Sequence, residues 1–177
     1  MENQSNPIMK SAMNYGLYLG LALVLNSVVF YVMGKPFSEV SGYLNYAIII
    51  GIIAWGMSSF QKYLGEEGLS YGRALGFGTL ISLFASLIFA FFTFVLYKII
   101  DPGLLAKFII FMEENFLKAG WPDNKIDMMI SFYKKFLTPF IFSLGQIFGV
   151  TLGGFIFSLI VAIFFKRQPS NPFHGVE

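Results

Sequence analysis

Residues 139–165 read PFIFSLGQIFGVTLGGFIFSLIVAIFF, an apolar run without a charged side chain. A helix needs about 20 such residues to cross the hydrocarbon core of a bilayer. Two cations, Lys166 and Arg167, close the run. The segment therefore predicts a membrane-spanning helix that ends at a headgroup layer.

The composition of the whole chain also indicates a membrane protein. Of its 177 residues, 56% are hydrophobic and 12% are charged. A soluble domain has about 25% charged residues, and a soluble chain of this size could not hide so much apolar surface. The net charge is only +2, without a face of clustered Lys and Arg, so we expect no nucleic-acid partner.

Three further apolar segments can span, at about residues 11–33, 43–60 and 72–99. The second is close to the lower limit for crossing. The first is too long for a signal peptide and lacks a small-residue cleavage pattern, so we expect it to be retained. The sequence thus predicts an all-α, four-helix membrane bundle in one domain over residues 1–167, followed by a disordered polar tail over 168–177.

Residues 103–138 form a long connection of a different kind. Apolar side chains recur there at helical spacing in two stretches, and charges occupy the other faces. The apolar sets are Leu105, Phe108, Ile109, Met112 and Phe116, then Ile126, Met129, Ile130, Tyr133, Phe136 and Leu137. Two such amphipathic helices are too charged to span. They can lie in the bilayer interface or form an extramembrane hairpin packed on itself or on the bundle, and the sequence favours neither.

Small residues recur every four positions in the spans. The candidate helix-packing glycines are Gly16, Gly20, Gly72, Gly76, Gly145, Gly149 and Gly153. Residues four apart share a helix face, and small residues there let two backbones approach closely in lipid. The alternative is that glycine is simply common in membrane helices. The triple in the last span favours a tight bundle, a homo-oligomer, or both.

Apart from Arg73 and Lys98 at the two ends of the third, the predicted spans contain no charged side chain, which weighs against a proton-coupled carrier. Asn26 and Gln146 are the polar groups that would cost most if left unsatisfied, and we expect them to join helices by hydrogen bonds rather than to contact a substrate. There is no cysteine, and the single histidine, His174, lies in the polar tail. No metal, phosphate-loop or catalytic spacing is present, so we expect no cofactor and no enzyme.

Several residues are expected at the level of the lipid headgroups. These interface anchors are Arg73, Trp121, Lys134, Lys135, Lys166 and Arg167. Arg73 belongs to the stretch EEGLSYGRALGFG at 66–78, where Ser70 is placed to cap the third span. A helix N-terminus disfavours a cation, so we expect Glu66 or Glu67 to pair with Arg73.

The chain resembles the bacterial integral-membrane family known as domain-of-unknown-function family 4199. The resemblance rests on EEGLSYGRALGFGTLIS leading into a long third span, the acidic and amphipathic connection, the lead-in KKFLTP, and a last span ending in AIFFKR. It implies four spans and a bacterial setting, in the inner membrane, but no activity and no functional residues. Lys and Arg are too evenly split for the positive-inside rule to decide orientation; we expect cytoplasmic termini because no exported N-terminal feature is visible.

These features favour a small membrane component without catalytic activity, which acts as a homo-oligomer or as an accessory subunit of a larger membrane complex. Two alternatives stay open. One is a transporter or channel for small solutes, formed by an oligomer with a path between protomers. The other is a lipid-interacting membrane enzyme in which residues 103–138 touch headgroups.

Overall fold

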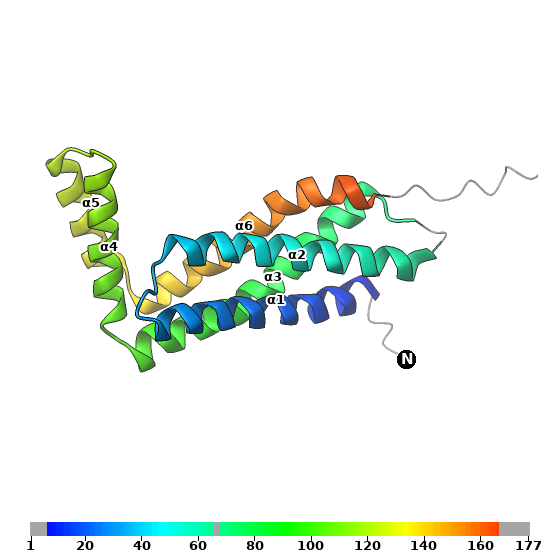
Figure 1. Ribbon diagram of the computed structural model, residues 1–177, viewed down its shortest axis with the longest axis horizontal. Helices are drawn as coiled ribbons and strands as arrows, with labels where there is room; N and C mark the ends of the chain where they lie inside the picture. Colours follow the sequence, from blue (N-terminus) through cyan, green and yellow to red (C-terminus); the bar gives the residue numbers. More distant parts are fainter. Residues whose placement is uncertain (1–6, 66–67, 167–177) are drawn as a thin grey trace, which may run out of the picture.

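The computed structural model describes residues 7–65 and 68–166, which form an all-α bundle with a helical hairpin at one end (Figure 1). In chain order the elements are α1 (Pro7–Val32), α2 (Glu39–Leu64), α3 (Tyr71–Val95), η2 (Leu96–Ile100), α4 (Leu104–Lys118), α5 (Asp123–Phe136) and α6 (Pro139–Phe165). Within the described residues, four helices are long and apolar enough to cross a membrane: α1, α2, α3 continued by η2, and α6. The predicted fold class is confirmed.

The long helices extend beyond the apolar segments that predicted them. α1 begins at Pro7 rather than near residue 11, and α2 has 26 residues where the sequence suggested about 43–60. At 1.5 Å per residue, 26 residues reach about 39 Å, which exceeds the ~30 Å hydrocarbon core. Polar end residues such as Gln61 and Lys62 can therefore stay helical while lying outside the hydrocarbon.

Local signals set the two ends of the third span. Ser70 is the N-cap of α3, and its hydroxyl accepts a hydrogen bond from the backbone N–H of Arg73 at 3.4 Å. At the other end the helix widens into the π-helical turn η2, where the backbone N–H of Asp101 donates to the carbonyl of Leu96 at 2.8 Å. The turn carries Tyr97 into the contact between the bundle and the hairpin.

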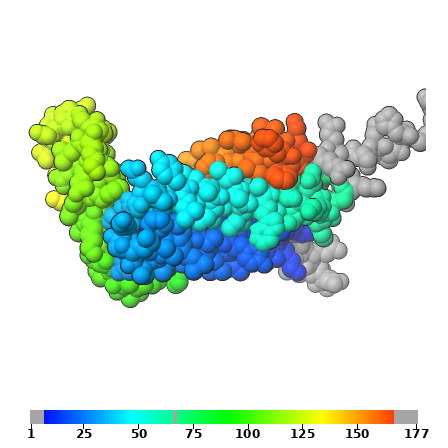
Figure 2. Space-filling view, viewed as in Figure 1, coloured from blue at the N-terminus to red at the C-terminus, as the bar shows by residue number. Residues whose placement is uncertain are grey.

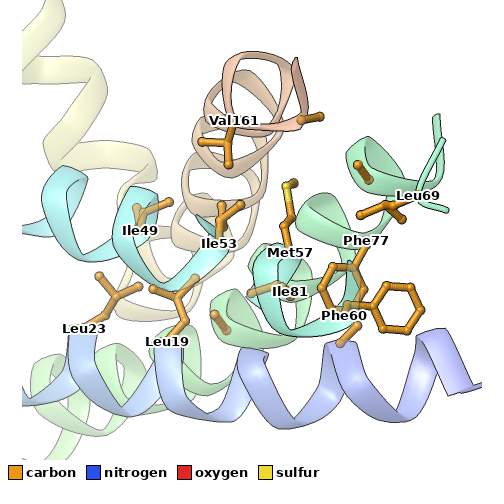
Figure 3. Packing of buried hydrophobic residues seen from close by; sticks show 14 residues of the cluster. Leu19, Leu23, Ile49, Ile53, Met57, Phe60, Leu69, Phe77, Ile81 and Val161 are labelled. Atoms are coloured by element: carbon orange, nitrogen blue, oxygen red, sulfur yellow. The ribbon is translucent and has the colours of Figure 1, made fainter. Parts of the chain in front are cut away.

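The core of the bundle lies around α3, which packs along α1 and α6 and also touches α2. All four long helices contribute apolar side chains to this core, together with Leu69 just before α3 (Figure 3). Figure 3 labels Leu19, Leu23, Ile49, Ile53, Met57, Phe60, Leu69, Phe77, Ile81 and Val161. The rings of Phe60 and Phe77 stack with their centroids 4.6 Å apart, and both side chains are buried.

The outer surface of the long helices is as apolar as the core. Phe91, Phe148 and Phe164 are each more than 70% exposed. In water such a surface would drive aggregation, whereas lipid tails solvate it without cost. The structure therefore has the surface of a membrane bundle.

The connection between α3 and α6 folds as a hairpin of α4 and α5. Ile109, Ile126 and Ile130 form its own buried core. The hairpin also contacts the bundle, because the ring of Phe108 lies 5.6 Å from that of Phe37 and 4.9 Å from that of Phe142. Figure 1 shows its helices running across the long axis of the bundle, at the end opposite to the start of α1 and the end of α6.

Candidate functional site

Helix α6 carries two ridges of small residues that lie one residue apart in sequence. Gly154, Ser158 and Ala162 are buried, whereas Gly145 and Gly149 are exposed and Gly153 is half-buried. Successive residues of an α-helix point about 100° apart. The two ridges therefore face different neighbours, and each can serve a different contact.

The inner ridge of α6 packs on a matching ridge of α3. Small buried residues recur every four positions along α3: Ala74, Gly78, Ser82, Ser86 and Ala90. A carbon added at Gly154 would overlap the Ser82 side chain, and one added at Gly78 would overlap Ser158 and lie 2.7 Å from the Cε of Met57. The two backbones thus approach as closely as glycine allows, which is how membrane helices gain packing energy.

Hydroxyl groups line the same contact between α3 and α6. Thr151 Oγ1 donates to Ser86 Oγ at 3.1 Å, and Ser82 Oγ donates to the carbonyl of Gly78 at 3.0 Å. Ser158 Oγ is buried and has no hydrogen-bond partner within the described part of the chain. The α3 ridge was not predicted from the sequence, although the four-residue spacing of Gly78, Ser82 and Ser86 is present there.

On α1, the predicted glycines Gly16 and Gly20 do face a neighbouring helix. Added carbons would lie 2.5 Å from the Cβ of Phe84 at Gly16 and 2.9 Å from the Cβ of Ile88 at Gly20. Both neighbours belong to α3. These two glycines therefore let α1 and α3 pack closely within the chain.

The predicted glycines on α3 and on the outer ridge of α6 make no close contact with another helix in the described part of the chain. An added carbon at Gly72, Gly76, Gly145, Gly149 or Gly153 would meet no other described atom within 4 Å. On α3, Gly76 lies about 200° around the helix from Ala74 and Gly78, so it points away from α6. Among the described residues, these five glycines therefore do not mediate close contacts between two helices.

Two glycines of the outer ridge of α6, Gly149 and Gly153, instead border a groove of about 270 Å³ between α2 and α6. The residues that line it are mostly small or polar on both helices. They are Leu23, Gly42, Asn45, Tyr46, Ile49, Phe89, Gln146, Gly149, Val150 and Gly153. The predicted residues Gln146, Gly149 and Gly153 thus come together in one place, with the side chain of Asn45 on the opposite wall; Gly145 does not line the groove.

The second predicted intramembrane polar residue, Asn26, holds α1 to α2. Its Nδ2 donates to Asn45 Oδ1 at 2.8 Å, to Ser41 Oγ at 3.1 Å and to the Ser41 carbonyl at 3.2 Å. The side chain is only 6% exposed. Sequence reasoning found Asn26 but not its partners, because they lie on a different helix.

We expect Asn26→Leu to lower the free energy of unfolding by about 1 kcal/mol, since hydrogen bonds between membrane helices average ~0.6 kcal/mol and reach ~1.7 kcal/mol. The loss leaves Asn45 Oδ1 without its donor at the helix contact. Unfolding by sodium dodecyl sulfate in mixed micelles measures the change. Asn14→Leu is the control on the same helix, because Asn14 is exposed; an equal loss in both variants would contradict this role of Asn26.

The predicted interface anchors lie at the two ends of the bundle and on the hairpin. Trp121 follows α4 and stacks on Phe116 with ring centroids 4.7 Å apart. Lys134 and Lys135 are exposed in the last turn of α5, and Lys166 is exposed directly after α6. Exposed basic side chains at these places can reach headgroups.

At the start of α3, Arg73 is exposed in the first turn. Its expected partners Glu66 and Glu67 lie outside the described residues, as does the predicted anchor Arg167. Within the described residues, no cluster of three or more His, Cys, Asp or Glu side chains could hold a metal ion.

Four long apolar helices that join through small residues and hydroxyls, with large apolar side chains outside, define a multi-pass helical membrane protein. The profile of one protein family matches residues 14–167, and the chain belongs to that family, which is described as "Protein of unknown function (DUF4199)". The resemblance seen in the sequence is thereby confirmed. No curated protein and no solved structure matches the chain.

Proposed function

We propose that this protein is a membrane component without catalytic activity that acts by association in the plane of the bilayer, and that its partner in the groove between α2 and α6 is a second copy of the chain. We further propose a bacterial inner-membrane location with cytoplasmic termini. The observation that carries the proposal is the outer ridge of Gly145, Gly149 and Gly153, where an added carbon would meet no other helix within 4 Å among the described residues.

A glycine inside a helix costs about 1 kcal/mol relative to alanine in water-exposed helices. The inner ridge of α6 recovers such a cost by close contact with α3. The outer ridge has no such close contact among the described residues to offset the cost. Its three glycines nevertheless share one face at four-residue spacing. Close approach of another helix is the contact that this spacing supports in lipid.

The polar side chains of the groove suit a partner that is identical. A carboxamide carries both donors and acceptors, so two copies of one amide can pair across a two-fold axis. Gln146 lies at the groove and makes no hydrogen bond to any described residue. Asn45 accepts from Asn26 through its Oδ1, which leaves its NH₂ group as a donor for a second chain.

The test is self-association in vesicles, measured by energy transfer between two differently labelled samples over a range of protein-to-lipid ratios. We expect Gly149→Leu to raise the dissociation constant about tenfold or more, because overpacking a close contact costs ~1–3 kcal/mol. Gly76→Leu is the matched control: it is the same substitution at a glycine with open surroundings, but outside the groove.

A chain that stays monomeric at every protein-to-lipid ratio would contradict the proposal. Equal weakening by Gly149→Leu and Gly76→Leu would contradict the assignment of the groove. Both variants must keep the unfolding midpoint of the unchanged chain, so that a loss of association cannot arise from a loss of fold.

A further inference from the structure

Helix α5 has two apolar faces, and the fold uses only one of them. Ile126 and Ile130 are buried against Ile109 of α4 in the core of the hairpin. On another side of α5, Met128, Phe132 and Phe136 are 64%, 54% and 47% exposed. We call these three residues, spaced four apart, the outer face of α5. The rings of Phe132 and Phe136 lie 4.8 Å apart, so the face is continuous.

The hairpin that carries this face lies across one end of the bundle. In Figure 1, α4 and α5 run across the long axis of the bundle, so they run along the membrane surface when the bundle spans the bilayer. Figure 2 shows that the hairpin reaches past the side of the bundle. The part that reaches past the bundle lies over lipid instead of over protein.

The outer face of α5 leads directly into the lipid-exposed surface of α6. Phe136 is the last residue of α5, and α6 begins three residues later at Pro139. Phe140, in the first turn of α6, is 59% exposed. It lines an apolar groove on the outside of the bundle with Leu87 and Phe91 of α3. A span that enters the hydrocarbon at Phe140 places Phe136 close to the headgroup boundary.

One cation of α5 lies beside the same surface: Lys135 is about 60° around the helix from Phe132, whereas Lys134 is about 160° from it. Lys134 and Lys135 are exposed in the last turn of α5, next to the start of α6. The Lys135 ammonium lies 5.4 Å from the centre of the Phe136 ring. Exposed lysines beside an apolar helical face are attracted to anionic lipids, at ~1 kcal/mol for each cation near the surface.

We propose that the outer face of α5 inserts into the headgroup layer of the bilayer around the bundle, with Lys135 on the headgroups of anionic lipids. The hairpin is then a second membrane anchor, and it fixes the depth at which α6 enters the hydrocarbon. This inference goes beyond the proposed association, because it concerns the contact of one protomer with lipid.

Spin labels at single cysteines test the insertion, because the natural chain has no cysteine. Phe132→Cys lies on the outer face, and Ser131→Cys is the matched control, since Ser131 is exposed and points about 100° away from Phe132. The full chain is reconstituted in vesicles of phosphatidylcholine with phosphatidylglycerol. Collision of each label with oxygen, which concentrates in lipid, is compared with collision with a water-soluble nickel complex.

We expect the label at residue 132 to collide mainly with oxygen, at a depth of ~5–10 Å below the headgroup boundary, and the label at 131 to collide mainly with nickel. Nickel collision at both positions would overturn the proposal, because the outer face would then lie in water. A label at 132 that is immobile and reached by neither collider would also overturn it, because protein would then cover the face.

The lipid charge is tested with the variant Lys135→Gln, carrying the label at residue 132. We expect a shallower label than in the unaltered background when phosphatidylglycerol is present, and no difference between the two backgrounds in pure phosphatidylcholine. Lys118→Gln, at the end of α4, is the charge-matched control. An unchanged depth in Lys135→Gln, or an equal change with Lys118→Gln, would overturn the role of Lys135.

Discussion

Gly154→Leu is expected to cause the largest loss of stability, about 3 kcal/mol in the free energy of unfolding. A side chain at this position would overlap Ser82 of α3, which is itself fully buried. Overpacking a filled contact typically costs ~1–3 kcal/mol and sometimes more. The upper end applies here because the obstruction includes the Cβ of Ser82, which cannot rotate out of the way.

The adjacent variant Gly153→Leu is the control for that result. An added carbon at Gly153 meets no described atom within 4 Å, so we expect a change below ~0.5 kcal/mol in the unfolding of the monomer, as for most surface substitutions. Unfolding by sodium dodecyl sulfate is measured in mixed micelles at a dilution that keeps the protein monomeric. If Gly153→Leu destabilises the monomer as much as Gly154→Leu, the inner ridge is misassigned.

Phe77→Ala is expected to lower the free energy of unfolding by about 2 kcal/mol. Phe77 is 0% exposed. Its ring stacks on that of Phe60 with the centroids 4.6 Å apart, and it makes an edge-to-face contact with Tyr15 with the centroids 6.4 Å apart. In lipid the loss of apolar transfer energy is small, so the cavity is the main cost. At ~24 cal/mol per Å³, an unfilled space of roughly 100 Å³ gives about 2 kcal/mol.

Phe91→Ala makes the same change on the same helix, at a side chain that is 72% exposed. We expect a loss below ~0.5 kcal/mol there, because lipid replaces the ring. The same unfolding titration compares the two variants. A small molecule that fills apolar cavities, such as benzene, should partly restore Phe77→Ala and leave Phe91→Ala unchanged. Equal losses in the two variants would contradict the central position of α3.

The sequence was sufficient for the class of protein and for most of the helices. A run without charges, such as residues 139–165, allows only a spanning helix, because backbone groups in hydrocarbon must bond within the segment. The caps were also local: Ser70 is the N-cap of α3 because its hydroxyl needs only the N–H three residues later. The hairpin helices were predicted from periodicity, but their contact with Phe37 of the bundle was not.

The candidate site shows what periodicity leaves open. Four-residue spacing identified small-residue ridges on three helices, yet Gly153 lines an open groove and Gly154 is buried against α3. The same spacing contains no information about which of two adjacent ridges faces inward. The partners of Asn26 were equally invisible, because Ser41 and Asn45 belong to another helix.

By itself, the sequence determined that this protein is a helical membrane bundle with ridges of small residues, and that charged groups of its predicted spans lie only at the ends of the third. Only the tertiary structure decided that Gly78 and Gly154 form the interior contact while Gly149 and Gly153 stay open. The physical reason is that lipid solvates every apolar face of a helix equally well, so hydropathy does not distinguish inside from outside. The rotation of each helix is set instead by where backbones and side chains fit together.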